Sequence, residues 1–386
     1  MNVFDVVELT RQMIIENTIS DASNLKLAEL IKDWLKQLGF DVEFQIQKFN
    51  QNSITKVNLI ARFGPRDREA LMFSGHMDTV PYGDLNDWTK DPFTPRLYDG
   101  KLGGLGAVDM KGSIAAMICA IEPLVKEPLR REIIFGLTFD EEIGLIGAKY
   151  LVESNLVKPK FIIIGEPTMM KPVRMHKGHI YVEVVCHGSS GHASDPEKGF
   201  NAIKVASEAI TVIQQFADEL KMSKCLEINP PYTTINIGTI HGGIKPNIIP
   251  SKCVINFDIR PIPGMTSQSL ISDIKGRLEN IGTFENRPLV SMQATRIPTE
   301  PVSTDQSSEI ILIAERVTGE RAHGVSYGTD GSILQKLSSQ ILILGPGSIN
   351  NAHKPNEFVA INQLGLAVKQ FREITRLICI TQEERS

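Results

Sequence analysis

The stretch ALMFSGHMDTV, residues 70–80, decides the fold class because an apolar run ends directly in charged side chains. Neighbouring side chains of a strand point to opposite faces, so a run that is apolar throughout predicts a strand buried on both faces. His76 and Asp78 follow at a spacing of two and point to the same side of the chain. REIIFGLTFDEE at 131–142 and FIIIGEPT at 161–168 share this plan. We therefore expect a sheet covered by helices on both faces, with acids and histidines at the ends of its strands.

Helical patterns alternate with these strands. LKLAELIKDWLKQLGF at 25–40 places apolar residues on one helical face, and GSIAAMICAIEPLV at 112–125 is apolar almost throughout. GAKYLVES at 147–154 and the stretch 362–378 add helices on either side of the strand-like QILILGPG at 340–347. Strands that alternate with helices predict an α/β domain with a mostly parallel sheet.

The pattern changes between residues 179 and 293. This part contains alternating strands at 180–188, 233–243 and 251–260, helices at 200–220 and 267–280, and a closing strand at 288–293. The order β-α-β-β-α-β predicts a smaller α+β domain of the ferredoxin-like type, with four strands and two helices. We expect residues 1–178 and 294–386 to form one catalytic domain and residues 179–293 to form a dimerisation or lid domain inserted into it.

The composition indicates a globular protein and excludes several partners. Of the 386 residues, 42% are hydrophobic and 22% are charged, which suffices for a substantial core. A net charge of −4 without a long basic run argues against nucleic acid as a partner. There is no run of about 18 apolar residues for a membrane span, and the first residues lack the pattern of a signal peptide. The five cysteines are dispersed without a CxxC pair, so we expect reduced thiols in a cytoplasmic protein.

Acidic and histidine side chains recur where predicted strands or loops end, at His76, Asp78, Asp109, Glu141, Glu142, Glu166 and His353. Each has a structural explanation when taken alone. A strand-end histidine is usually hydrogen-bonded, Asp109 precedes a helix that it could cap, and the paired glutamates suit a helix start. Glu166 is different, because a lone carboxylate directly after a buried strand is costly without a partner.

As a set, these residues fit a pair of divalent ions. Ligands of open α/β sheets bind outside the carboxyl ends of the strands, so the side chains are expected to converge on one crevice. Histidines and carboxylates without cysteine suit Zn²⁺, Co²⁺ or Mn²⁺. Two ions about 3.5–4 Å apart need a bridging carboxylate and terminal ligands. One further carboxylate must stay free to take a proton from water.

The motifs GHMDTVPYGD, WTKDPF, DGKLGGLGAVDMKG, FDEEIG, GEPT and NNAHKPNE occur in this order along the chain. Together they resemble the M20 family of dinuclear zinc aminoacylases and peptidases, over nearly the whole chain including the inserted domain. Within the family, GEPTMMKPVRMHKGH, SSGHASDP, FDIRPIPGM and GPGSINNAHKP are similar to stretches of the acetylornithine deacetylases. The succinyl-diaminopimelate desuccinylases share the metal motifs but match these stretches less well.

The resemblance implies a role for each matching residue. His76 and Glu166 would bind one ion, Glu142 and His353 would bind the other, and Asp109 would bridge the two. Asp78 would orient the imidazole of His76 from behind. Glu141 would be the general base that deprotonates the bridging water and then delivers the proton to the leaving amine.

For the inserted domain, the resemblance implies that His192 stabilises the tetrahedral oxyanion, reaching across a dimer interface. Arg260 would pair with the α-carboxylate of the substrate, and Asn247 would lie near the same substrate. Gly347 belongs to a loop that would present His353 and the substrate pocket. The structural alternative for His192 is a loop histidine capped by neighbouring serines, and the alternative for Arg260 is a surface arginine at the end of a strand. The sequence has Gly103 where the family commonly has a tyrosine, and this departure replaces none of the implied metal ligands.

The resemblance predicts hydrolysis of the acetamide of N2-acetyl-L-ornithine to L-ornithine and acetate. Two divalent ions, zinc or alternatively cobalt, would be the cofactors, and a homodimer would form through the inserted domain. The alternatives are a desuccinylase, a broader aminoacylase or dipeptidase, and a metal-binding protein without catalysis. Asp330 is interpreted either as a contact for the cationic side chain of ornithine or as a helix N-cap.

Overall fold

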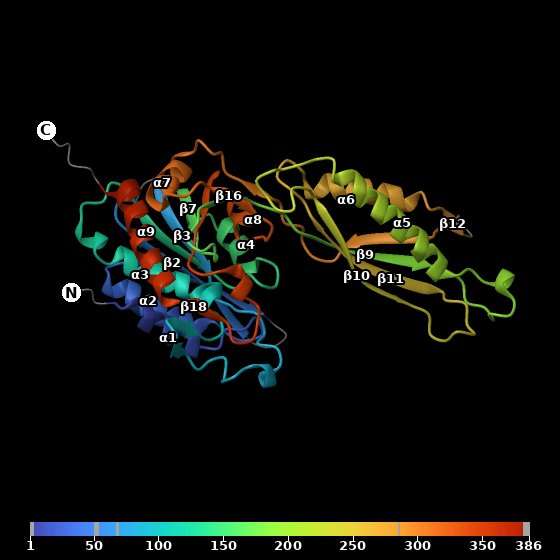
Figure 1. The fold of residues 1–386 in the computed structure, drawn as a ribbon, viewed down its shortest axis with the longest axis horizontal. Helices are drawn as coiled ribbons and strands as arrows, with labels where there is room; N and C mark the ends of the chain where they lie inside the picture. Colours follow the sequence, from blue (N-terminus) through green and yellow to red (C-terminus); the bar gives the residue numbers. More distant parts are fainter. Residues whose placement is uncertain (1–3, 50–53, 67–68, 285, 381–386) are drawn as a thin grey trace. The chain divides into compact units, whose positions relative to one another are not determined.

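A computed structural model describes residues 4–49, 54–66, 69–284 and 286–380. The chain forms two compact units, which are drawn in Figure 1. Unit 1 contains the described residues up to Arg174, the segment Ser303–His323 and the described residues from Thr329 onward. Unit 2 contains Met175–Val302 and Gly324–Gly328. Each unit has a hydrophobic core of its own.

A large sheet in the order β1-β2-β6-β3-β7-β17-β8-β15, with β16 beside β8, organises unit 1. Its strands are β1 (Asp41–Phe49), β2 (Ile54–Phe63), β3 (Ala70–His76), β6 (Ile133–Thr138), β7 (Pro159–Ile164), β8 (Val173–His176), β15 (Val302–Ser303), β16 (His323–Val325) and β17 (Gln340–Ile343). β3 pairs in parallel with β6 and β7, and β7 pairs in parallel with β17. β1, β2 and β8 add antiparallel pairs at the flanks. The predicted α/β class with a mostly parallel central sheet is confirmed.

Helices cover both faces of this sheet (Figure 1). They are α1 (Val6–Ile15), α2 (Leu25–Gln37), α3 (Gly112–Ile121), α4 (Ile146–Glu153), α7 (Glu309–Thr318), α8 (Gly331–Leu334) and α9 (Ile361–Cys379). On one face, Phe371 of α9 contacts Phe73 of β3, whose ring also stacks on Phe135 of β6. Gly136 follows Phe135 and therefore points to the other face, where Leu151 of α4 lies against it. Burial on both sides explains why all seven residues of β3 are buried.

A small sheet in unit 1 brings together two segments that are far apart in the sequence. It consists of β4 (Arg96–Tyr98), β5 (Lys101–Gly103) and β18 (Phe358–Ala360) in the order β18-β5-β4. β18 pairs with β5, so the chain that follows His353 lies beside the chain that leads to Asp109. The short helical segments of unit 1 are η1 (Leu85–Asp87), η2 (Ala107–Lys111), η3 (Leu124–Lys126) and η5 (Ile349–Asn351).

Unit 2 has a four-stranded antiparallel sheet in the order β10-β11-β9-β14. Its main elements are β9 (Ile180–His187), α5 (Ala202–Leu220), β10 (Thr234–Gly242), β11 (Lys252–Arg260), α6 (Ser267–Glu279) and β14 (Val290–Ala294), together with η4 (Pro196–Lys198) and the hairpin β12 (Thr283–Phe284) and β13 (Arg287–Pro288). Burial alternates along β9 and β11, and their buried side chains form one core with α5 and α6. α5 begins after Asn201, whose side chain accepts hydrogen bonds from the backbone N–H groups of Ile203 and Lys204.

Two further features follow from the side chains. All five cysteines are free; Cys225 is half-buried and the other four are buried. In the part of the chain that the structure describes, no helix combines the length and the hydrophobicity needed to cross a membrane.

Candidate active site

Neighbouring parallel strands of unit 1 carry the candidate ligands at a common edge. β6, β3, β7 and β17 are adjacent and parallel, so their carboxyl ends lie at the same edge of the sheet. His76 is the last residue of β3, Glu141 and Glu142 follow β6, and Glu166 follows β7. His353 lies in the loop after β17. The topology thus explains how residues more than 270 positions apart come together, since 353 and 76 differ by 277.

Asp109 lies between two imidazoles. It belongs to η2, directly before α3, and is 6% exposed. Its Oδ1 is 2.9 Å from His76 Nε2, and its Oδ2 is 3.3 Å from His353 Nε2. The turn before it depends on Gly106, whose φ of 78° is strained for other residues and where a Cβ would come within 2.8 Å of Thr79. Each oxygen of one carboxylate therefore faces a different histidine.

The side chains form two ligand groups that share Asp109. His76, Asp109 and Glu166 make up one group, and Asp109, Glu142 and His353 make up the other. Within each group, the ligand atoms lie within 4.8 Å of one another. His353 Nε2 is 3.0 Å from Glu142 Oε1, and His76 Nε2 is 3.6 Å from Glu166 Oε1. Glu141 is in neither group, although it makes a third grouping with His76 and Glu142. The structure thus brings together the six predicted side chains His76, Asp109, Glu141, Glu142, Glu166 and His353.

The electrostatics of the site fit divalent cations. Burial raises the pKa of Glu141, Glu142 and Glu166 because a buried carboxylate loses its hydration. Hydrogen bonds with Asp109 and Glu142 raise the pKa of His353 to about 10. Burial lowers the pKa of His76, but the bond with Asp109 and the nearby carboxylates outweigh it, so this pKa lies well above its usual value. The carboxylates favour the protonated form of both histidines, and bound divalent cations would neutralise the same negative charge. The nitrogen and oxygen donors suit Zn²⁺ or Co²⁺.

Asp78 supports this site from behind in two ways. Its backbone carbonyl accepts the Nδ1–H of His76 at 2.9 Å, while its carboxylate Oδ1 is 3.7 Å from the same nitrogen. This bond leaves Nε2 of the neutral imidazole free to face a metal ion. The carboxylate of Asp78 accepts the backbone N–H of Glu141 at 3.1 Å and that of Glu142 at 3.3 Å. Asp78 thereby holds the loop that carries both glutamates, a contact that the sequence pattern does not indicate.

Other buried polar residues around the site were not predicted. Lys56 Nζ is 2.6 Å from Asp140 Oδ1, and both side chains are almost fully buried. This ion pair anchors the residue before Glu141. The only available signals were a lysine at the start of an apolar strand and an aspartate beside the paired glutamates. Neither identifies the other as its partner.

Asp330 occupies the N-cap position of α8, but its side chain makes no capping hydrogen bond. Its Oδ2 instead accepts from Thr138 Oγ1 at 2.7 Å, and the residue is 2% exposed. Burial raises its pKa to about 6. Asp330 therefore belongs to the interior of unit 1, and its side chain does not act as the helix cap that the sequence suggested.

The predicted residues of unit 2 form two local arrangements. His192 is exposed, and its Nδ1 is 2.6 Å from Ser194 Oγ. The backbone N–H of Ala193 donates to the carbonyl of Asn247, so the loops that carry His192 and Asn247 lie side by side. Arg260 ends β11, and its Nε donates to Asp258 Oδ2 at 2.9 Å. His179 Nε2 lies 3.1 Å from Oδ1 of the same aspartate, so the two oxygens of Asp258 contact Arg260 and His179 respectively.

Gly347 is in unit 1, in the loop between β17 and His353. Its φ is 79°, and a Cβ there would come within 2.5 Å of Val108, the residue before Asp109. A glycine thus lets this loop approach the segment that carries Asp109.

Residues 72–376 match the model of the peptidase family M20/M25/M40. This chain belongs to that family. Its fold is similar to a tripeptidase from Staphylococcus aureus, with 23% identity, a TM-score of 0.78 and 97% of both chains covered. An M20 metallo-carboxypeptidase from Sulfolobus solfataricus has 19% identity and a TM-score of 0.77, with 97% of this chain and 99% of that chain covered. A dinuclear metal-binding M20 peptidase from Bacillus subtilis has 15% identity and a TM-score of 0.70, with 97% of both chains covered. The chain is accordingly an M20 hydrolase that carries candidate sites for metal ions.

The support from Asp78 can be tested by the substitution Asp78→Asn. An amide nitrogen would face one of the two N–H donors of Glu141 and Glu142, so we expect a roughly 10–100-fold weaker affinity for divalent metal. Competition against a chromophoric chelator measures this affinity. Asp5→Asn, at an exposed helix cap, is the matched control and should leave it unchanged. An Asp78→Asn variant with wild-type affinity would contradict the supporting role.

Proposed function

We propose that this M20 hydrolase uses two divalent metal ions to remove the acetyl group from N2-acetyl-L-ornithine, giving L-ornithine and acetate in arginine biosynthesis. The observation that carries the dinuclear mechanism is Asp109, shared between two ligand groups while Glu141 stands outside both. The substrate is proposed from the stretches similar to acetylornithine deacetylases. We further propose zinc as the resident metal, with cobalt as the alternative, and a cytoplasmic location in keeping with the free cysteines.

The protein side chains divide the work of amide hydrolysis. When bound, the metal ions supply Lewis-acid polarisation of the acyl oxygen and make water acidic enough to react near neutral pH. His76, Glu166, Glu142 and His353 would hold them, with Asp109 between. A carboxylate oxygen of Glu141 would accept a proton from the attacking water and then donate it to the leaving nitrogen. The oxygen of the deprotonated water would form a C–O bond to the acyl carbon, the amide C–N bond would break as the protonated amine leaves, and acetate and ornithine would result.

Unit 2 would supply the substrate contacts. The guanidinium of Arg260 would pair with the α-carboxylate, and Asp258 already orients it through Nε. The exposed imidazole of His192 would donate a hydrogen bond to the developing oxyanion, with Asn247 beside it. Gly347, in unit 1, would belong to the loop that presents His353 and the substrate pocket, and it lets this loop approach Val108 closely.

The second candidate substrate is an amino acid with a charged acyl group. A small neutral acetyl group needs no cationic partner, whereas a succinyl group carries a second carboxylate. Lys177 is buried in unit 2, and burial together with the charge of Arg260 lowers its pKa to about 8. This second cation near Arg260 is the observation that favours a desuccinylase. Peptide substrates are a further alternative, because the tripeptidase and the carboxypeptidase share the fold.

Turnover of defined substrates tests the proposed specificity. The chain is loaded with Zn²⁺ or Co²⁺ and offered N-acetyl-L-ornithine, N-succinyl-diaminopimelate and a dipeptide, each with a chelated control. We expect acetylornithine to give the highest kcat/KM and chelation to abolish it. A preference for the succinylated substrate or the dipeptide would overturn the specificity and retain the metal mechanism. Turnover that persists after complete metal removal would overturn the mechanism.

Glu141→Gln tests the proposed general base. A carboxamide cannot accept the proton from water, so we expect kcat to fall by about 10²–10⁴-fold. Metal stoichiometry, measured by elemental analysis, should stay at the wild-type value because Glu141 lies outside the two groups that share Asp109. Glu153→Gln, an exposed glutamate at the end of α4, is the control for the loss of one charge. Substantial remaining activity in Glu141→Gln would show that another group takes the proton.

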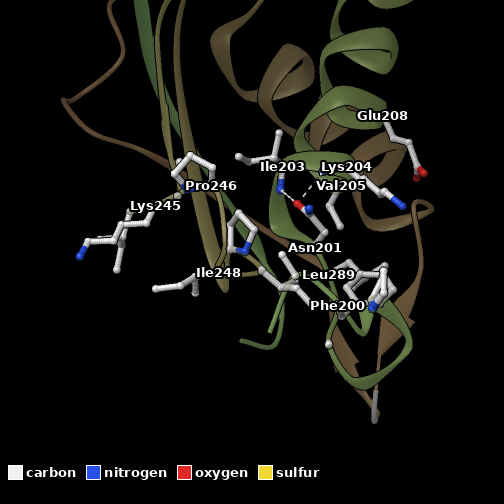
Figure 2. Close-up of a pocket in the computed structure, with 18 residues that line it drawn as sticks. Phe200, Asn201, Ile203, Lys204, Val205, Glu208, Lys245, Pro246, Ile248 and Leu289 are labelled. Atoms are coloured by element: carbon white, nitrogen blue, oxygen red, sulfur yellow. Dashed lines mark hydrogen bonds between the residues drawn. The ribbon is translucent and has the colours of Figure 1, made fainter. Parts of the chain in front are cut away.

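We also propose that a second copy of the chain covers one surface of unit 2. β10 is an edge strand of the four-stranded sheet, so among the described residues no strand of that sheet pairs with the other side of its backbone. A hollow of about 810 Å³ lies beside it, and Figure 2 shows Ile203, Pro246, Ile248 and Leu289 around this space. Ile248 pairs through its backbone with His192. A partner that covers this surface would thus bury the segment that carries His192 and Asn247.

A mixed dimer tests whether His192 acts on the partner's site. One copy carries Glu141→Gln, the other carries His192→Ala, and two different tags isolate the mixed species. If His192 acts across the interface, one site keeps both groups, and we expect about half of the wild-type turnover per dimer. A dimer with Glu141→Gln in both copies should remain inactive. An inactive mixed dimer would place His192 in its own subunit's site, and a monomer in solution would remove the dimer proposal.

A further inference from the structure

Glu357 is a buried carboxylate outside both ligand groups. It is 2% exposed, and it accepts three backbone hydrogen bonds from the segment that carries Asp109. Its Oε2 accepts from Gly106 N at 3.0 Å, and its Oε1 accepts from Val108 N at 2.8 Å and from Asp109 N at 3.2 Å. One side chain thus satisfies most of the backbone donors in the turn that ends at Asp109.

Glu357 also connects this turn to the loop of His353. It lies four residues after His353 and directly before β18. Its backbone carbonyl accepts from Gly104 N at 2.9 Å, which extends the pairing of β18 with β5. The same residue therefore holds the Asp109 segment through its side chain and through its backbone. Both histidine-facing oxygens of Asp109 depend on where that segment lies.

The surroundings of residue 357 explain why a carboxylate, and not an amide, occupies this position. A buried acid so close to Asp109 adds negative charge to a region that already contains several carboxylates. Burial and the charge of Asp109 raise the pKa of Glu357 to about 8, and the three N–H donors on its two oxygens counteract part of this shift. The buried Lys111 also interacts electrostatically with Glu357. A glutamine cannot replace this arrangement, because its NH₂ group would face at least one of the N–H donors in either orientation.

We infer that Glu357 is a positioning residue that fixes the backbone of Gly106–Asp109 and thereby holds the Asp109 carboxylate between His76 and His353. This inference rests on the proposed metal-binding role of Asp109. Glu357 acts on Asp109 through backbone hydrogen bonds, so its effect should appear in metal binding before it appears in substrate binding.

Glu357→Gln tests the inference with the full chain and with metal alone. Titration with Zn²⁺ against a chromophoric chelator gives stoichiometry and affinities, and the visible absorption of Co²⁺ reports the coordination geometry. We expect at least one of the two affinities to fall about 10–100-fold and the Co²⁺ spectrum to change. Glu357→Asp keeps the charge but has a shorter reach, and we expect it to lie between the glutamine variant and the wild type.

Glu132→Gln is the matched control. Glu132 is another fully buried glutamate of unit 1, but it pairs with Arg62 at 2.9 Å and Arg66 at 3.3 Å. It lies directly before β6, at the opposite end of that strand from Glu141 and Glu142. We expect it to lower the melting temperature and to leave both affinities and the Co²⁺ spectrum unchanged. If Glu357→Gln does not fold, the same comparison is made with Glu357→Asp.

The outcomes separate this inference from the proposed function. A wild-type chain that binds no divalent metal would overturn the proposed function and, with it, the inference. A wild-type chain that binds two ions, together with Glu357 variants of wild-type affinity and spectrum, would overturn the inference alone. Equal weakening in Glu132→Gln would also overturn it, because the effect would then come from general destabilisation.

Discussion

Asp109 faces His76 at 2.9 Å and His353 at 3.3 Å, and the arrangement of unit 1 serves to keep one carboxylate between these two imidazoles. The two histidines come from the end of β3 and from the loop after β17, so the sheet must bring both to one edge. Glu142 and Glu166 arrive at the same edge from the ends of β6 and β7. Burial, and after it the repulsion from neighbouring carboxylates, raises the pKa of Glu142 and Glu166, so both effects oppose the arrangement.

The residues that support the ligands mostly do so through backbone N–H groups. Asp78 accepts two of them from the Glu141–Glu142 loop, and Glu357 accepts three from the Gly106–Asp109 turn. Hydrogen bonds to charged groups contribute about 1.5–3 kcal/mol each, enough to hold a short loop in one conformation. N–H dipoles stabilise carboxylates without adding a full positive charge. The site consequently keeps a negative charge that divalent ions can neutralise.

A buried ion pair also supports the loop that carries Glu141. Lys56 and Asp140 are both buried, and removing one partner of such a pair costs about 3–5 kcal/mol because the other charge is left alone. Asp140 directly precedes the proposed general base in the sequence, so stability and catalysis depend on the same loop. In unit 2, Asp258 plays a comparable part by orienting Arg260 while His179 contacts its other oxygen. Relatives that share this fold act as tripeptidase and carboxypeptidase, which agrees with specificity residing in side chains placed on a common scaffold.

The sequence by itself determined the main strands and helices and indicated the candidate ligands. Short apolar runs such as 70–75 and 161–164 indicate strands covered on both faces, and the alternation in 180–187 indicates a strand with one buried face. The motifs at the strand ends were sufficient to name the candidate ligands. The partners of those ligands were decided by the tertiary structure alone. Glu357 and Asp78 accept hydrogen bonds from backbone N–H groups of distant segments, although Glu357 stands in the NNAHKPNE motif. Lys56 forms an ion pair with a buried aspartate that is far away in the sequence. A hydrogen bond to a backbone N–H leaves no residue-type signature on the donor, so only the folded chain shows which segments such side chains hold.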